Sequence, residues 1–251
     1  MRSANPVLDR LDDTSRAHRL PAAGGAAAVT VDDVVARTVG LLLLTGVTAA
    51  VAWVVVPQAV WLPAALAGIA LAGIALVLVI SLRGLTHPAP IIGYALLQGL
   101  LLGVASRAFE LVYPGIVAQA VIGTFGVFLG MAVLYRARVV RATPRLARLV
   151  VGTLLGLLAV VVANLVVRLV TGGRGLDIYS LTGDVGWLSY AFSAVAIVAG
   201  ALSFVLDFDM VERSVRTGLP RRYAWLCAFG LLVGLVFLYW QVLRLLSYVR
   251  R

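Results

Sequence analysis

Seven long apolar runs, separated by short polar segments, constrain this chain more than any other feature of its sequence. They are Val39–Val56, Ala59–Leu82, Pro90–Ala108, Gly115–Tyr135, Leu146–Val170, Gly186–Leu206 and Tyr223–Val249. A helix of about 20 apolar residues crosses the hydrocarbon core of a bilayer, and none of these runs shows the period-two alternation of a transmembrane strand. The sequence therefore predicts an all-α polytopic membrane protein, a bundle of seven transmembrane helices.

The small share of charged residues supports this class and argues against others. Only 13% of the residues are charged and 62% are hydrophobic, whereas soluble domains carry about 25% charged residues. The basic residues are all arginine and give a net charge of +10, yet they flank the apolar runs and form no continuous basic face. We therefore expect contacts with the lipid bilayer and its anionic lipids, and no nucleic acid partner.

The start of the chain differs in composition from the rest. Residues 1–30 have mixed charges and no apolar core, so we expect a flexible cytoplasmic tail and no signal peptide. Thr30 and Asp33 then resemble a capping box, which predicts that a helix begins near Val31. The sequence thus divides into a tail over residues 1–30 and a seven-helix transmembrane domain over residues 31–251.

The arginines are distributed unevenly between the two ends of the expected bundle. Fifteen lie on the side of the N terminus and six on the other side. Because positive residues accumulate on the cytoplasmic side, we expect the N terminus in the cytoplasm and the C terminus outside. Richness in Ala, Val, Leu and Gly, with arginine as the only strongly basic residue, is typical of a high-GC bacterial genome. We therefore expect the protein in the plasma (inner) membrane of a bacterium.

The sequence contains no G-x-S-x-G motif of a catalytic serine, no glycine-rich phosphate-binding loop with lysine and no H-E-x-x-H zinc motif. His18 and His87 are too far apart in sequence to suggest a shared metal site, and Cys227, alone in an apolar run, fits a structural thiol. Asp184 and Asp207 could pair as in an aspartyl intramembrane protease, but the expected topology puts them at opposite faces of the membrane, too far apart to share a proton. We therefore expect no enzymatic activity and no cofactor.

Polar residues within the apolar runs are candidates for hydrogen bonds between helices. They are Gln98, Gln119, Thr124, Asn164, Arg168, Gln241 and Arg244. Arg168 and Arg244 lie near the outer ends of their runs, from which a guanidinium group can reach water. Glu110 follows Arg107 by three residues, a spacing that favours an ion pair on a helix.

Asp207 and Asp209 stand at the end of an apolar run, in the segment "SFVLDFDMVERSVRTG". A carboxylate there must face water, pair with a cation or serve a function. In one interpretation they are interface carboxylates, neutralised by Arg213, Arg216, Arg221 and Arg222. In the other, one of the two faces the bundle interior and serves a function. Residues two apart on a helix point about 200° away from each other, so we expect only one of the two to face inward.

Several segments together carry a resemblance to a known family. The segments "YALLQGLLLGVASRAFELVYPGIVAQAVIGTFGVFLGM", "LDFDMVERSVRTG" and "LYWQVLRLLSYV", with "SANPVLDRL" near the start, resemble the Bax inhibitor-1 family of seven-helix membrane proteins, in a bacterial subgroup. The resemblance covers nearly the whole chain from Val31, with Asn5 and Pro6 in the tail. It implies a calcium leak through the membrane that is gated by pH.

The family's proposed pH sensor is a pair of aspartates, and the resemblance puts the first on Asp207. It therefore implies that Asp207 is the carboxylate that faces the bundle interior and lines a cation path, with Asp209 as a second oxygen ligand for calcium. The second position, in the family's pattern L-Y-x-D, falls on Gln241 of "LYWQ". Two carboxylates that share a proton respond to pH, whereas a carboxylate and an amide lack the like-charge repulsion behind that response. We take Asp207, Gln241 and Arg244 as candidates for a gate or latch, and we expect a weaker pH dependence than a carboxylate pair gives.

Two functions from different classes remain open. The first is a cation leak channel or transporter, with calcium as the transported ion and Asp207 in or near the path. The second is a non-conducting membrane protein that modulates a protein partner in the membrane, such as a membrane protease or a stress-response factor. A polar cavity lined by Asp207 and reaching towards the membrane midplane favours the first; a dry bundle with Asp207 in the headgroup zone favours the second.

Overall fold

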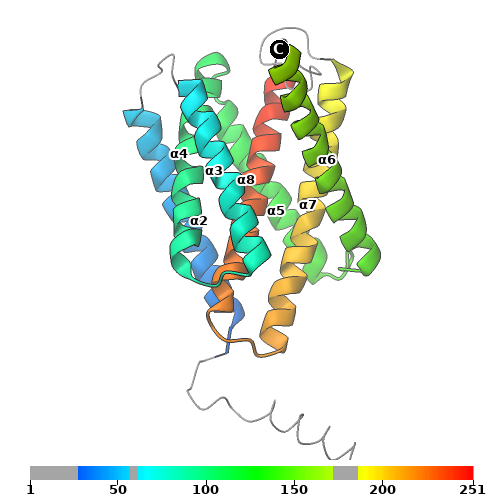
Figure 1. Cartoon of the computed structure of the whole chain (residues 1–251). Coiled ribbons are helices and arrows are strands. Elements are labelled where there is room, and N and C mark those ends of the chain that lie inside the picture. The colour runs from blue at the N-terminus through cyan, green and yellow to red at the C-terminus, as the bar shows by residue number, and fades with distance from the viewer. Residues whose placement is uncertain (1–27, 57–61, 172–185, 251) are drawn as a thin grey trace, which may run out of the picture.

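The computed structural model describes residues 28–56, 62–171 and 186–250. In this part of the chain seven helices are long and apolar enough to cross a membrane, which confirms the prediction of an all-α seven-helix bundle (Figure 1). They are α2 (Val31–Val55), α3 (Leu62–Arg83), α4 (Pro88–Val112), α5 (Ile116–Arg136), α6 (Pro144–Thr171), α7 (Trp187–Arg216) and α8 (Tyr223–Val249).

Some predictions concern residues outside the described part of the chain. These are the flexible tail up to residue 27, with Asn5, Pro6 and His18, and Asp184 of the protease interpretation. The side chain of Arg168 is also outside it. Residues 28–30, the last of the expected tail, are described: the backbone N–H of Val29 donates to the Leu219 carbonyl oxygen at 2.8 Å.

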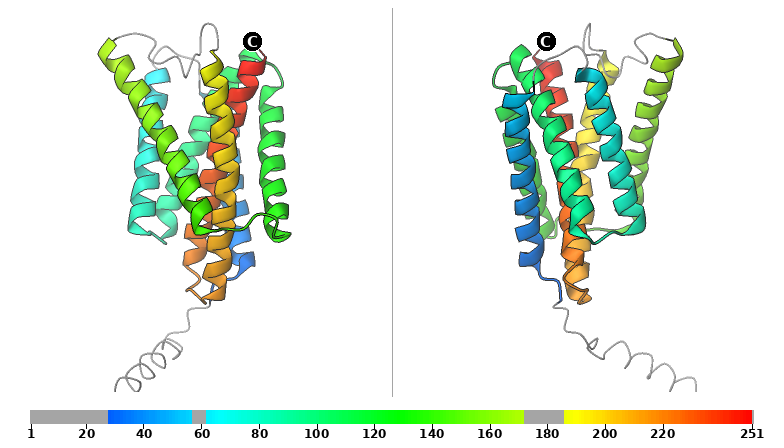
Figure 2. Two further views of the ribbon diagram at one scale, coloured as in Figure 1. Left: turned by 90° about the vertical axis from the view of Figure 1, so that its right-hand side faces the viewer. Right: turned by 60° about the vertical axis from the view of Figure 1, so that its left-hand side comes forward.

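The central helix of the bundle is α8. It packs against α2, α4, α5 and α7, while α3 packs on α4 and α6 packs on α7 at the periphery (Figure 2). The window of α8 that could span the membrane is more buried than that of any other helix, and those of α3 and α6 are the least buried. Leu43, Leu71 and Leu155 are large apolar side chains exposed on outer helices, as expected where a helix contacts lipid.

The two ends of the bundle differ in charge. The start of α2, the turn after α3, the α5–α6 loop and the α7–α8 loop lie at one end, and the C terminus lies at the other (Figure 1). Arginine side chains that the structure describes gather at the first end, namely Arg37, Arg83, Arg136, Arg138, Arg141, Arg145, Arg148, Arg213, Arg216, Arg221 and Arg222. The second end has Arg107, Arg244 and Arg250. We call the first the arginine-rich end.

The helix starts follow from local capping. The Thr30 side chain accepts a hydrogen bond from the Asp33 backbone N–H at 3.1 Å, and α2 begins at Val31, so the predicted capping box is present. The α4 helix begins with Pro88, whose fixed φ suits a first turn. His87 caps this helix, because its Nδ1 atom accepts from the Ala89 N–H at 3.3 Å.

The α7 helix is longer than the apolar run that predicts it. The apolar run Gly186–Leu206 predicts that the transmembrane helix ends near Leu206, yet α7 continues to Arg216. The extension stays helical because Val211 and Ser214 are buried on one side, while Asp209 and Arg213 form an ion pair one turn apart. With 30 residues, α7 is about 45 Å long, which exceeds the roughly 30 Å hydrocarbon core. Its last turns therefore project from the hydrocarbon at the arginine-rich end.

The closest helix contact joins α4 to α2. A Cβ atom at Gly99 would lie 2.6 Å from the Thr45 carbonyl oxygen, and one at Gly103 would collide with the backbone of Ala49. Glycines spaced G-x-x-x-G allow two backbones to approach in this way, and "GLLLG" at residues 99–103 has that spacing. The sequence interpretation missed this signal, although the residues lie in one of the segments that carry the family resemblance.

Candidate functional site

Asp207 lies on α7 where this helix packs against α8. The packing follows three successive contacts. A Cβ atom at Gly200 would lie 3.0 Å from the Phe237 ring, one at Gly234 would lie 2.8 Å from Cε1 of Phe204, and one at Gly230 would lie 3.4 Å from Oδ1 of Asp207. The two helices are thus antiparallel and close, and Asp207 faces α8. This is the inward orientation that the family resemblance implied.

The surroundings of the Asp207 carboxylate are largely apolar. The carboxylate faces Gly230, and the Cβ position of Gly230 also lies 3.5 Å from the methyl group of Met210. Cys227, one turn before Gly230, is buried, and its thiol donates to the Ser214 hydroxyl at 3.7 Å. The ion pairs among the described residues are Asp209–Arg213 and Asp33–Arg221, so Asp207 forms none in this part of the chain. A partly buried carboxylate without a cation is unfavourable and marks a candidate functional residue.

Asp209 faces the opposite side of α7. Its Oδ2 atom lies 2.6 Å from Nε of Arg213, and it lines a pocket at the arginine-rich end. Asp207 and Asp209 therefore do not converge on one ion, and the interpretation of Asp209 as a second calcium ligand beside Asp207 finds no support in this geometry. Among the described residues, no group of three or more His, Cys, Asp and Glu side chains could hold a metal ion.

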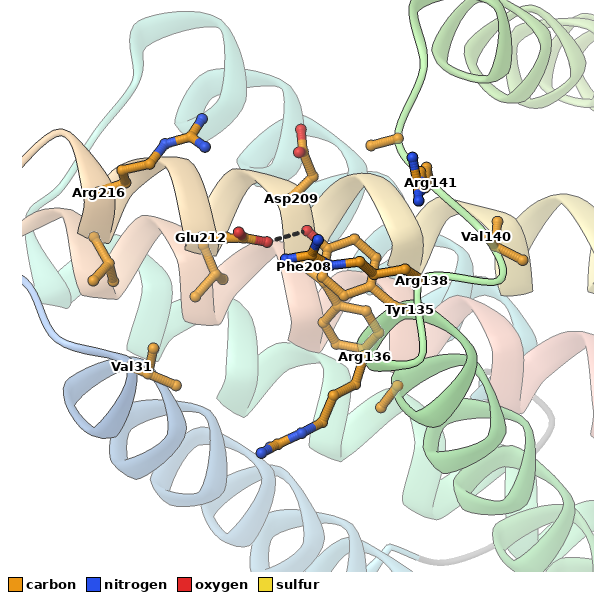
Figure 3. A pocket seen from close by; sticks show the side chains of 14 residues that line it. Val31, Tyr135, Arg136, Arg138, Val140, Arg141, Phe208, Asp209, Glu212 and Arg216 are labelled. Atoms are coloured by element: carbon orange, nitrogen blue, oxygen red, sulfur yellow. Dashed lines mark hydrogen bonds between the residues drawn. The ribbon is translucent and has the colours of Figure 1, made fainter.

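The pocket beside Asp209 has a volume of about 850 Å³. Its charged lining residues are Arg136, Arg138, Arg141, Asp209, Glu212 and Arg216, and we call it the arginine pocket. Asp209, Glu212 and Arg216 project from α7, whereas Arg138 and Arg141 come from the α5–α6 loop (Figure 3). The Tyr135 hydroxyl donates to Oε2 of Glu212 at 2.7 Å and joins α5 to α7.

Aromatic rings fill the space between α5 and α7 behind the arginine pocket. The ring centroids of Tyr135 and Phe208 are 5.6 Å apart, those of Phe208 and Phe128 are also 5.6 Å apart, and those of Phe128 and Phe204 are 5.1 Å apart. Phe208 lines the pocket and Phe204 is fully buried. The aromatic cluster, made of Phe128, Tyr135, Phe204 and Phe208, therefore closes the inner wall of the pocket.

Gln241, the position of the family's second aspartate, does not lie beside Asp207. Gln241 is buried and follows Gly230, the neighbour of Asp207, by 11 residues of the same helix, which is about 16 Å along its axis. Arg244 lies a further turn away. The cause is the short α7–α8 connection, residues 217–222. It brings the end of α7 next to the start of α8, so Asp207, near the end of α7, packs near the start of α8 and not near Gln241. The candidate latch residues Asp207, Gln241 and Arg244 are thus not assembled in this conformation.

Contacts at the end opposite the arginine-rich end replace the expected pair of Arg107 and Glu110. Arg107 donates to the Trp53 carbonyl oxygen at 2.7 Å and to that of Val56 at 3.2 Å. Glu110 accepts from the backbone N–H groups of Gly115 and Val117 at the start of α5. The ion pair expected from their spacing is absent from the described contacts, because unsatisfied backbone groups at two helix ends bind these side chains instead.

The remaining polar residues of the spans have separate roles. Gln119 is exposed, whereas Gln98, Thr124 and Asn164 are buried. Thr124 donates to the Ala120 carbonyl oxygen of its own helix at 2.7 Å.

A second contact at the arginine-rich end was not foreseen. Asp33, at the start of α2, binds Arg221 of the α7–α8 loop with 2.6 Å between Oδ1 and Nη2. Arg37 donates to the Arg221 carbonyl oxygen at 2.9 Å, and its guanidinium lies 5.3 Å from the centroid of the Trp225 ring. These contacts tie α2 to α8. Their residues are 184 to 188 apart in the chain, a separation that no local pattern predicts.

Comparison with known proteins identifies the family. No curated protein matches the chain. The family model described as "Bax inhibitor 1 like" matches residues 5–251, which include all seven helices and the segment of Asp207. The chain therefore belongs to the Bax inhibitor 1 like family of multi-pass membrane proteins.

Proposed function

We propose that this protein is a cation leak channel or transporter, with calcium as the cation, whose path passes the contact between α7 and α8 beside Asp207. One observation carries the proposal. Asp207 faces α8 next to Gly230, in largely apolar surroundings, and forms no ion pair with the described part of the chain. A charged group in that setting is unfavourable unless it has a function, and passing cations give it one.

The proposal treats this conformation as closed. Three pockets in the described residues lie around Asp209, Tyr239 and Arg107, and none of them is lined by Asp207. The aromatic cluster stands between the arginine pocket and the inner side of α7. A path would therefore open when α7 moves relative to α5 and α8. Such motion would break the hydrogen bond of Tyr135 to Glu212 between α5 and α7. It would also break those of Tyr190 to the Tyr248 carbonyl oxygen and of Cys227 to Ser214 between α7 and α8.

The orientation of the carboxylates bears on how firmly an ion would be held. Calcium takes six to eight oxygen ligands, and Asp207 offers one carboxylate to the α7–α8 contact because Asp209 points away. Conduction requires sites weak enough for the ion to leave. A site with a single carboxylate suits a leak better than tight binding of calcium. The proposal involves no cofactor and no catalysis.

A second function is favoured by a different observation. A non-conducting protein that modulates a partner in the membrane, such as a protease or a stress-response factor, needs no cavity at Asp207. The tight contacts of Phe204 with Gly234 and of Gly200 with Phe237 agree with such a dry bundle. Calcium flux into liposomes that hold the purified protein separates the two functions: flux that depends on Asp207 supports the first, and no flux at any pH supports the second.

A further inference from the structure

The arginine pocket has positive groups without partners and negative groups that are already engaged. Asp209 pairs with Arg213, and Glu212 accepts from the Tyr135 hydroxyl. The side chains of the four arginines of the pocket form no ion pair and no hydrogen bond with the described part of the chain. Their guanidinium groups, each a planar fork of N–H donors, are therefore available to an anion.

The backbone at Arg138 brings one of these guanidinium groups to the pocket. Arg138 follows the end of α5 with φ at 58°, and it is the non-glycine residue with positive φ among those described. After α3 and α7 the equivalent position is glycine, at Gly84 and Gly218, as is usual because a Cβ atom disfavours this conformation. At the end of α5 an arginine stands there instead, and its side chain extends from the loop towards α7 (Figure 3).

The rest of the pocket is apolar and lies at the membrane boundary. The aliphatic lining residues are Val31, Ala132, Val140, Ala142, Val211 and Val215, and Phe208 adds an apolar ring. Val139, next to Arg138 in the loop, is 70% exposed. An exposed valine flanked by arginines is suited to the boundary between headgroups and acyl chains, where apolar and cationic groups both find partners. The pocket therefore presents a cationic rim and an apolar wall to that boundary.

We propose that the arginine pocket binds the phosphate headgroup of an anionic membrane phospholipid. Guanidinium groups bind phosphate through paired, charge-assisted hydrogen bonds, and the apolar wall accommodates the glycerol and the first carbons of the acyl chains. A volume of about 850 Å³ is within the range of small-ligand sites. Basic pockets between transmembrane helices on the cytoplasmic side bind such headgroups in other proteins. The site is independent of any passage of cations.

Titration of the full-length purified protein in phosphatidylcholine nanodiscs with phosphatidylglycerol tests the site. Arg138→Gly removes the guanidinium and keeps a residue suited to positive φ, and Arg141→Gln removes the second charge. Arg145→Gln, in the exposed first turn of α6 and outside the pocket, is the matched control. We expect the affinity for phosphatidylglycerol to fall about tenfold or more in the double variant of residues 138 and 141, and to stay within twofold in the control.

Three results would overturn the proposal. The first is native affinity for phosphatidylglycerol no higher than for phosphatidylcholine. The second is an equal loss in the Arg145→Gln control, which would assign the effect to diffuse surface charge. The third is competition by soluble glycerol phosphate or inorganic phosphate at the same concentration as the lipid, which would assign the pocket to a soluble phosphate. If the double variant does not fold, Arg141→Gln alone carries the comparison.

Discussion

Asp207 on α7 lies against Gly230 on α8, where a Cβ atom would stand 3.4 Å from its Oδ1 atom. One turn further along α8, Gly234 meets Phe204 more tightly, with a Cβ position 2.8 Å from the buried ring. The pair of glycines thus sets how closely α7 approaches α8, and with it the position of the carboxylate.

The two glycines should respond differently to the same substitution. Gly230→Ala should leave thermal stability unchanged or slightly raised, because the new methyl group fits at ordinary contact distance and alanine favours a helix. Gly234→Ala should destabilise the protein by about 1–3 kcal/mol, because Phe204 is fixed in the core. Thermal unfolding in detergent measures both, with Gly126→Ala, in open space, as control. Equal losses at 230 and 234 would contradict the packing of α7 on α8.

The position of a second carboxylate should decide whether flux responds to pH. Gln241→Asp should leave the pH profile of calcium flux unchanged, because that residue is about 16 Å along α8 from the neighbour of Asp207. Cys227→Asp should sharpen the profile, because it lies one turn from Gly230 on the side of Asp207, where two carboxylates can share a proton. Flux measured in liposomes over a range of pH tests this. A sharpened profile in Gln241→Asp alone would place Gln241 beside Asp207.

The charge of the two ends predicts the orientation of the protein in the membrane. With the arginine-rich end in the cytoplasm, the C terminus is outside. A reporter that is active only in the cytoplasm should therefore be silent when fused after Arg251, and active when fused in the α5–α6 loop, for example after Val139. Activity of the C-terminal fusion would show that the orientation is reversed.

The helices could be predicted from the sequence because a segment inside a bilayer can adopt few backbone structures. Each apolar run must satisfy its backbone hydrogen bonds internally, so it forms a helix, and the run Tyr223–Val249 gives the bounds of α8. The continuation of α7 to Arg216 was missed because charged residues end the hydropathy signal. There Val211 packs on the core while Asp209 and Arg213 face outward, a pattern that depends on a neighbouring helix.

The candidate site was predictable only in part. Helical spacing indicates that Asp207 and Asp209 face opposite sides, and their contacts have that arrangement. The partner position of Asp207 was not predictable, because a motif gives the order of residues but not how far one helix is shifted along another. Arg138 and Glu212 line the same pocket although they are 74 residues apart in the chain, and this proximity arises from the packing of α5 and α6 on α7.

Calcium flux through the reconstituted protein is the most direct test of the central claim, that Asp207 lies in or near a cation path. Asp207→Asn removes the charge and keeps the size, and Asp209→Asn, on the other side of the same helix, is the matched control because its exposed ion pair contributes only about 0–1 kcal/mol to stability. We predict that Asp207→Asn changes the flux severalfold, while Asp209→Asn stays near the native rate and both variants remain folded. Equal effects of the two substitutions, or no effect of Asp207→Asn, would contradict the account.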